Sequence, residues 1–515
     1  MASLRLLSID TILCVALAVV STTAHAQTLA RDKVTAALPA LETMARQAIE
    51  SGGVPGLAIA VVHNDEVVYL KGFGRRDAGK PDLVDGDTVF QIASLSKPVS
   101  STVVAALVSD GVAGWDSRIA ELDPAFQLRD AYPTAELTVR DLFAHRSGLP
   151  GTAGDDLEDI GFGRAEVLRR LRLVAPLSSF RAGYSYSNAG LTEGAIAAAR
   201  PTGKAWETVA EDKLYRPLGM TATSSRHDDF VGRTNRAALH VKVNGAWAAT
   251  LKRNPDMQAP AGGVSSSARD LAQWMRLELA DGTYAGKRLI AAAALEEARV
   301  PLMARGVNPV TGGASFYGLG WNIEFGRHGP TRGHAGAFSV GARTLVTLYP
   351  KAGLGILVLS NAFPSGVPEG LSDSFADLVF TGKVEKDWIK PWNDVYDGLF
   401  GAAVAAAKAA YGTRPTPAAA ALPLAAYIGR YNNAYVGDAL VTDRNGVLTL
   451  SVGPGGARSY ALTHFDRDLF LYFPSAELPD MPQAVRFAIG PNGKATDVTI
   501  ESLNDWGMGT LKRSD

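Results

Sequence analysis

The sequence predicts an α+β protein in which helices flank an antiparallel sheet and form a large insertion, followed by a small all-β domain. Three observations lead to this fold class. A pair of alternating or apolar strands is expected near each end of the first 385 residues. Segments with the helical spacing of apolar residues separate the two pairs. Beyond about residue 415, short strand-like segments joined by Asn-Gly turns replace the helical pattern.

The first 26 residues have the pattern of a secretory signal peptide. Arg5 precedes an apolar run over residues 12–20, and the small residues of AHA at 24–26 suit cleavage after Ala26. A membrane anchor is the less favoured alternative, because the run is shorter than the roughly 18 residues of a membrane span. Cleavage would remove Cys14, the only cysteine, so disulfides and thiolate chemistry are excluded from the mature chain. We expect a secreted or periplasmic protein without a transmembrane span.

The first domain is expected over residues 27–385. After a helix from about Lys33 to Glu50, the segment GLAIAVVHNDEVVYLKGFG has the pattern of two strands joined by a polar turn. A second hairpin far downstream combines TLVTLYP with LGILVLSN. Helical patterns such as AEVLRRLRLV and DLAQWMRLELA lie between the two hairpins, which indicates strands from both ends of the domain in one antiparallel sheet.

The remainder of the chain divides into a connection and a second domain. Residues 386–421 combine an alanine-rich helix with a linker rich in proline and alanine. Residues 422–515 alternate apolar and polar positions between Asn-Gly turns, which favours hairpins. We therefore expect a small β-barrel-like C-terminal domain.

Composition and charge exclude several classes of partner. A formal net charge of −1 without a basic cluster argues against nucleic acid. The triplet His227-Asp228-Asp229 lacks the second histidine at i+4 that a helical metal site would use, so no metal is expected. No segment indicates a cofactor either, which leaves a small molecule or a peptide as the expected substrate.

A serine and a lysine lie three residues apart in VFQIASLSKPVSS, which begins at Val89. On a helix, residues i and i+3 share one face, so the Ser94 hydroxyl and the Lys97 amine can come within hydrogen-bond distance. Pro98 places the helix start close to Ser94, because proline is tolerated well only in the first turn. Unpaired N–H groups there suit a developing oxyanion. The alternative is that Ser94 only caps a helix, since serine is a favoured N-cap.

Two further segments carry groups suited to the same chemistry. In GYSYSNAG, Tyr186 and Asn188 share one side of an extended segment, where a phenol can relay a proton and an amide can hold a substrate carbonyl or the lysine. In TRGHAGAF, the glycine of His334-Ala335-Gly336 would let a substrate approach an edge strand, and the next N–H could serve an oxyanion hole. For GYSYSNAG the alternative is a turn before a helix, with Asn188 as the helix cap. For TRGHAGAF it is an ordinary glycine-rich turn.

These three motifs, in this order, resemble those of the penicillin-binding-protein and class C β-lactamase superfamily, serine hydrolases that include D-aminopeptidases and esterases. Similar family segments are LTVRDLFAHRSGLPG from Leu137, PAGGVSSSARDLAQW from Pro260 and YGLGW from Tyr317. The resemblance covers roughly residues 35–365 and implies a β-lactamase/transpeptidase-like fold. The C-terminal domain resembles the lipocalin-like β domain of some peptidases of this group, which implies that it shapes or shields the cleft.

The resemblance also implies roles for individual residues. Ser94 corresponds to the acylated serine, Lys97 to its base partner and Tyr186 to the tyrosine that relays the proton. Substrate binding falls to Asn188, His334 and Gly336, and the oxyanion hole to the N–H groups of Ser94 and Ala337. His145, in the FAHRSG part of the Leu137 segment, is expected to be a hydrogen-bonded core residue rather than a catalyst.

One position departs from the family pattern. Penicillin-recognising members usually have Lys-Thr-Gly or Lys-Ser-Gly where this chain has His334, and without the lysine the field that attracts a substrate carboxylate is weaker. We therefore expect an exported serine hydrolase that acts through an acyl-enzyme on peptide or amide bonds, D-residue substrates included. Carboxylic esters and then β-lactams are the alternative substrates within the superfamily. A noncatalytic cell-wall binding protein or sensor that kept the fold is the second alternative.

The N-terminal pattern gives a first prediction. Protein recovered from an exporting host begins at Gln27, because the small-residue cleavage site directly precedes it. N-terminal sequencing or intact mass measures this directly. A soluble, active protein that retains Met1 would contradict it.

Overall fold

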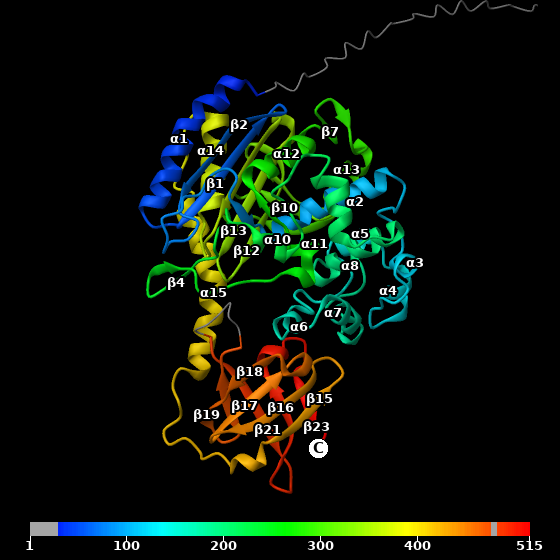
Figure 1. The fold of residues 1–515 in the computed structure, drawn as a ribbon, viewed down its shortest axis with the longest axis vertical. Coiled ribbons are helices and arrows are strands. Elements are labelled where there is room, and N and C mark those ends of the chain that lie inside the picture. The colour runs from blue at the N-terminus through cyan, green and yellow to red at the C-terminus, as the bar shows by residue number, and fades with distance from the viewer. Residues whose placement is uncertain (1–28, 475–480) are drawn as a thin grey trace, which may run out of the picture.

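The computed structural model describes residues 29–474 and 481–515, as an upper domain built on a sheet and a lower barrel (Figure 1). The expected signal peptide and Cys14 lie outside the described residues. Within those two ranges, none of the helices has both the length and the apolar composition that crossing a membrane requires.

The upper domain, called the sheet domain below, is organised around an eight-stranded antiparallel sheet. Strands from both ends of the domain form it, as the sequence predicts, because β1 pairs with β14 from Leu57 with Ser360 to His63 with Leu354. The strand order is β2 (Glu66–Gly74), β1 (Gly56–His63), β14 (Leu354–Ser360), β13 (Ala342–Tyr349), β12 (Gly329–Phe338), β11 (Asn322–Gly326), β10 (Ala314–Tyr317), β9 (Met303–Val307).

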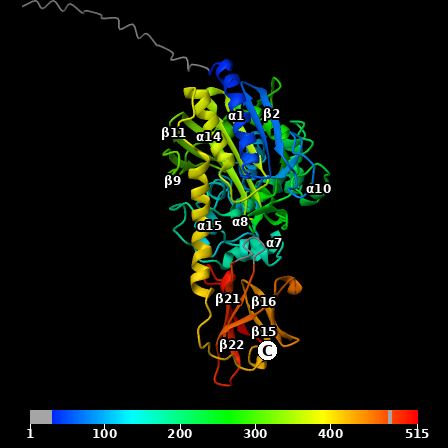
Figure 2. The same cartoon turned by 90° about the vertical axis from the view of Figure 1, so that its left-hand side faces the viewer.

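Helices cover both faces of this sheet, so β1 is buried along its whole length. Alternate side chains of a strand point to opposite faces, and β1 divides accordingly: Leu57 and Ile59 join one apolar core, whereas Ala58 and Ala60 join the other. The first core is closed by α1 (Arg31–Glu50) and α14 (Val367–Thr381), which pack on each other at the face seen in Figure 2. The second core is closed by α2 (Ser96–Ser109) and α12 (Ala268–Leu279).

The large helical insertion lies on the second face and lacks long strands. Its remaining helices are α3 (Ile119–Leu122), α4 (Ala131–Glu136), α5 (Val139–Phe143), α6 (Asp155–Asp159), α7 (Arg164–Arg170), α8 (Asn188–Ala199), α9 (Trp206–Ala210), α10 (His227–Gly232), α11 (Ala259–Gly262) and α13 (Ala292–Ala298). Three small ribbons accompany them: β3 (Val89–Gln91) with β6 (Ser265–Ser267), β4 (Val241–Val243) with β5 (Ala246–Ala248), and β7 (Thr283–Tyr284) with β8 (Lys287–Arg288).

A long helix, α15 (Ile389–Tyr411), leads from the sheet domain to the barrel (Figure 1). The barrel strands are β15 (Gly429–Asn433), β16 (Gly437–Arg444), β17 (Val447–Val452), β18 (Arg458–Ala461), β19 (Thr463–Asp466), β20 (Leu469–Tyr472), β21 (Gln483–Ile489), β22 (Ala495–Ile500) and β23 (Thr510–Arg513). The two edge strands of this sheet, β18 and β19, are separated only by Leu462, so the sheet curls into a nearly closed barrel. The predicted Asn445-Gly446 turn joins β16 to β17, with both residues at positive φ.

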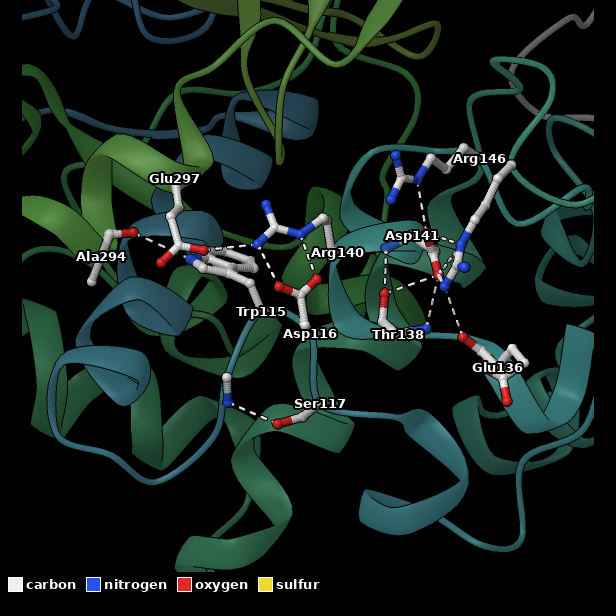
Figure 3. Close-up of polar contacts among 12 residues, drawn as sticks. Trp115, Asp116, Ser117, Glu136, Thr138, Arg140, Asp141, Arg146, Ala294 and Glu297 are labelled. Atoms are coloured by element: carbon white, nitrogen blue, oxygen red, sulfur yellow. Dashed lines mark hydrogen bonds and ion pairs between the residues drawn. The ribbon is translucent and has the colours of Figure 1, made fainter.

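A polar network fixes the segment that begins at Leu137. Thr138 and Asp141 form a capping box at the start of α5, each accepting from the other's backbone N–H. Asp141 is fully buried, and it accepts a hydrogen bond from Arg146 Nε at 2.7 Å (Figure 3). It also accepts one from Arg181 Nη2 at 2.8 Å. Burial alone would raise the pKa of this carboxyl, but Arg181 and Arg146 hold it below its ordinary value.

Asp141 is therefore predicted to be a main anchor of the sheet domain. Asp141→Ala should lower the free energy of unfolding by about 3 kcal/mol, because it leaves two arginines without their buried partner. Tryptophan fluorescence during urea unfolding measures the loss. Of the eight tryptophans only Trp506 lies in the barrel, so the signal reports mainly on the rest of the chain.

The matched control is Asp116→Ala. Asp116 also pairs with an arginine, Arg140 (Figure 3), but the side chain of Asp116 is 73% exposed. Without Asp116, Arg140 would still have Glu297 as a partner. Its loss should cost less than about 1 kcal/mol. Equal costs for the two variants would refute the special role of Asp141.

Candidate active site

Ser94 lies in a short 3₁₀ turn, Ala93–Leu95, directly before α2. Within residues 88–107, all of which the structure describes, it is the one residue whose surface is partly exposed. No side chain caps either helical segment, so the cap interpretation of Ser94 is wrong. Ala93 has φ of +49°, a conformation costly for a residue with a Cβ, which indicates that the surrounding structure holds this turn in place.

The amine of Lys97 lies within hydrogen-bond distance of three oxygens. Its Nζ is 3.2 Å from Ser94 Oγ, 2.7 Å from Asn188 Oδ1 and 2.9 Å from the carbonyl oxygen of Ala261. Lys97 is fully buried. The spacing of three residues therefore does bring the serine and the lysine together, as the sequence predicts.

Burial lowers the pKa of Lys97 to about 7, although the carboxylate of Asp155 acts in the opposite direction. A neutral amine has two N–H donors and one lone pair. The two donors suffice for Asn188 and Ala261, so the lone pair is left for the Ser94 hydroxyl. This is the arrangement that a general base for Ser94 requires.

Tyr186 is a further neighbour of the amine, with Lys97 Nζ 4.4 Å from the centre of its ring. Burial raises the pKa of Tyr186 above its ordinary value, while a hydrogen bond with Ser94 partly offsets the shift. The phenol consequently stays protonated near neutral pH and can donate a proton. The raised pKa of Tyr186, the lowered pKa of Lys97 and the 3.2 Å between Lys97 Nζ and Ser94 Oγ together favour Lys97 over Tyr186 as the base.

Asn188 is the first residue of α8, and the N-cap is Ser187, whose side chain accepts from Gly190 N. The alternative that made Asn188 the cap is thus wrong. Both ends of its amide have partners: Oδ1 accepts from Lys97, and Nδ2 donates to Asp155 Oδ2 at 2.9 Å. In this structure Asn188 fixes the lysine, and its contact with a substrate amide stays a prediction.

The ring of His145 packs against that of Tyr186. It is buried, its Nδ1 accepts from Ser187 N at 3.1 Å, and its ring centroid lies 4.6 Å from that of Tyr186. Burial lowers the pKa of His145 well below its ordinary value. As expected, this histidine is a neutral, hydrogen-bonded core residue.

His334, Gly336 and Ala337 belong to β12, which faces the turn of Ser94. A Cβ on Gly336 would lie 2.1 Å from Ile92 O and 3.0 Å from Leu95 N, so only glycine allows this approach. The approach brings β12 against the Ser94 turn, and the oxyanion hole formed by the N–H groups of Ser94 and Ala337 stays a prediction. His334 is buried, and its Nε2 lies 3.0 Å from the Tyr317 hydroxyl. Burial lowers the pKa of His334 to about 3, which makes it neutral at physiological pH.

The expectation that His334-Ala335-Gly336 lies at a sheet edge is confirmed, although β12 is an edge over only part of its length. Up to Gly333, β12 is an interior strand between β11 and β13. From His334 to Phe338, its described strand partner is β13 alone, so this half is a local edge.

Two residues near the site were not found from the sequence. Asp155 comes from the acidic run GDDLED, whose proximity to Asn188 depends on the fold. Arg305 is exposed on β9, with Cζ 5.5 Å from the Tyr184 ring, and its charge contributes to the lowered pKa of His334. Neither has a neighbouring motif that could have indicated it.

His227-Asp228-Asp229 is the triplet for which the sequence predicts no metal site. It forms the start of α10, where Asp229 accepts from the Ser224 hydroxyl at 2.6 Å. In the part of the chain that the structure describes, histidine, cysteine and acidic side chains do not gather in groups of three that could hold a metal.

Two family profiles match the chain. The profile of the family described as Beta-lactamase matches residues 41–379. A second profile, described as a domain of unknown function (DUF3471), matches residues 413–509. The lipocalin-like resemblance of the barrel is not confirmed by this match and stays a prediction.

Similar proteins include hydrolases and penicillin-binding proteins. Unguisins hydrolase ungD' of Aspergillus campestris is 25% identical over 500 residues, which is 91% of each chain. Penicillin-binding protein 4 of Amycolatopsis lactamdurans is 28% identical over 319 residues, 60% of this chain and 81% of the relative. The octameric penicillin-binding protein homologue from Pyrococcus abyssi aligns with a TM-score of 0.58 and 18% identity over 92% of this chain and 99% of its own. This last likeness shows the fold alone.

The burial of Lys97 predicts the pH dependence of the site. kcat/KM for Ser94 acylation should rise through about pH 7 and level off above it, because protonation removes the lone pair of Lys97. The titratable groups that face this amine are Asp155, Tyr186, His145 and His334.

Variants separate these groups. Lys97→Ala should remove the rise. Burial raises the pKa of Asp155 to about 7, so this carboxyl titrates over the same pH range as Lys97. Asp155→Asn should shift the rise to lower pH, because the ionised carboxylate raises the pKa of Lys97. His334→Gln should leave the rise in place, since His334 titrates at about 3. A rise that survives in Lys97→Ala would identify another group as the base.

Proposed function

The chain belongs to the beta-lactamase family of serine hydrolases, and on that premise we propose that it cleaves peptide or amide bonds through an acyl-enzyme on Ser94. The Ser94 hydroxyl transfers its proton to the lone pair of Lys97 as Oγ attacks the substrate carbonyl. The N–H groups of Ser94 and Ala337 bind the resulting oxyanion.

Collapse of this intermediate breaks the bond to the leaving amine, which needs a proton. Tyr186 is placed to donate it, because its phenol is protonated and adjoins both Ser94 and Lys97. The ammonium of Lys97 then returns a proton to Tyr186. Water attacks the acyl-enzyme by the same route and releases the acid together with Ser94.

The open half of β12 is the observation that favours peptides and amides. From His334 to Phe338 the strand lies beside the Ser94 turn and pairs with β13 on one side. An extended substrate can add its backbone along such an edge, which gives main-chain hydrogen bonds to an amide on either side of the scissile bond. A small ester uses few of these bonds, so esters rank second.

Electrostatics rank β-lactams third. His334 is neutral and buried, so it supplies no fixed charge for a substrate carboxylate. Arg305 is the exposed cation whose field reaches Tyr186 and His334, but it lies on β9 rather than on β12. Export through a signal peptide, with cleavage after Ala26, completes the proposal and rests on the sequence pattern alone.

A hydrolysis panel tests this ranking with D- and L-aminoacyl amides, short-chain nitrophenyl esters and a chromogenic cephalosporin. An aminoacyl amide should have the highest kcat/KM, and Ser94→Ala should abolish every activity. Cephalosporin turnover near about 10⁶ M⁻¹s⁻¹, in the upper enzymatic range, would make a β-lactamase the better interpretation.

Covalent labelling separates an enzyme from a noncatalytic binding protein. A fluorophosphonate should label wild type and leave Ser94→Ala unlabelled. The matched control is Ser96→Ala, because Ser96 is buried and its hydroxyl accepts from Val264 N instead of facing the cleft. It should retain labelling at a cost of about 1 kcal/mol in stability. Labelling that persists in Ser94→Ala would place the nucleophile elsewhere.

A further inference from the structure

The helix α6 lies directly above the barrel (Figure 1) and is hydrogen-bonded to it. Tyr435, between β15 and β16, is fully buried, and its hydroxyl donates to Asp156 Oδ1 at 2.7 Å. Arg170 of α7 donates to the backbone oxygen of the same tyrosine. This one turn of the barrel is thus bonded to two helices of the sheet domain.

Backbone contacts hold the end of α6 as well. Arg458 Nε donates to Asp159 O at 3.0 Å. A Cβ on Gly453 would lie 1.9 Å from Ile160 O, so the barrel backbone approaches closer than any other residue would permit. Buried apolar contacts also continue without interruption from the sheet domain into the barrel. The position of α6 therefore depends on the barrel.

The residue next to Asp156 bonds in the other direction. Asp155 Oδ2 accepts from Asn188 Nδ2 at 2.9 Å, and Asn188 Oδ1 accepts from Lys97 at 2.7 Å. The other oxygen, Asp155 Oδ1, is buried and has no hydrogen-bond partner among the described residues. The hydrogen bond from Asn188 is consequently the one that holds this carboxylate. A shift of α6 would therefore move Asn188 and, through it, the amine of Lys97.

We infer that Tyr435 of the barrel is a positioning residue for catalysis, which holds α6 so that Asp155 orients Asn188 and Lys97. The chain of contacts runs from Tyr435 to Asp156, across one peptide unit to Asp155, and then to Asn188 and Lys97. The inference rests on the proposed function, since it concerns the base of that reaction. It makes the barrel part of the active apparatus rather than a separate appendage.

Tyr435→Phe removes the hydroxyl and keeps the buried ring. With the best amide substrate, kcat should fall about fivefold, the value of one lost hydrogen bond, while KM stays within about twofold. The matched control is Tyr431→Phe, since Tyr431 is an equally buried barrel tyrosine whose hydroxyl donates to Tyr427 O inside the barrel. It should keep the kcat of wild type even if it lowers the melting temperature.

A double-mutant cycle tests whether the effect passes through α6. Asp156→Ala should reduce kcat by a similar factor, and the variant with both changes should be no worse than either alone. Asp155→Ala should reduce kcat further, and Asp155→Asn should recover part of the loss, because an amide oxygen can still accept from Asn188. If Tyr435→Phe does not fold, Asp156→Ala tests the same bond from the other side.

The outcomes separate this inference from the proposed function. Loss of all activity and labelling in Ser94→Ala, together with wild-type kcat in folded Tyr435→Phe and Asp156→Ala, would overturn the inference and keep the function. The inference would also be overturned if the falls in kcat of Tyr435→Phe and Asp156→Ala multiplied in full in the double variant. Activity that persists in Ser94→Ala would instead refute the proposed function.

Discussion

The burial of the Lys97 amine is the constraint on which the site depends. A charged amine is costly in an apolar interior, so the protein must neutralise it or surround it with acceptors. Here it does both, because the pKa falls to about 7 and three oxygens lie within hydrogen-bond distance. The acceptors come from residues 94, 188 and 261, which are far apart in the chain. Closing the helical insertion around one nitrogen is therefore what assembles the site.

Two neighbouring groups keep that arrangement rigid. Asp141 is buried and pairs with Arg146, which directly follows His145, and with Arg181. These bonds fix the segment that carries His145. His145 in turn accepts from Ser187, the cap of α8, and thereby places Tyr186 and Asn188 on either side of it. The family segment from Leu137 thus acts indirectly, by fixing the start of α8, where Asn188 is the first helical residue and Tyr186 lies two positions before it.

The helix α6 carries three buried carboxyl groups, whose partners come from both domains. Burial raises the pKa of Asp155 to about 7, of Asp156 to about 6 and of Glu158 to about 8. Each carboxyl depends on a partner from elsewhere: an amide of the site for Asp155, a barrel tyrosine for Asp156, and Arg253 with Gln258 for Glu158. The partners of Asp155 and Glu158 come from the sheet domain and Tyr435 comes from the barrel, so the barrel supplies part of what satisfies the buried carboxyls of α6.

The sequence by itself determined the local features. The strand pairs at both ends, the Asn445-Gly446 turn and the Ser94–Lys97 spacing follow from residue periodicity and turn chemistry, which act over a few positions. Only the tertiary structure decided that Ser94 caps no helix, that half of β12 is an edge, and that Asp155 and Tyr435 adjoin the site. The hydrogen bonds of Asp155 with Asn188 and of Tyr435 with Asp156 join residues 33 and 279 positions apart, and no pattern within a short window encodes such distances. Burial, which sets the pKa of Lys97 and His334, likewise depends on what the whole fold places around them.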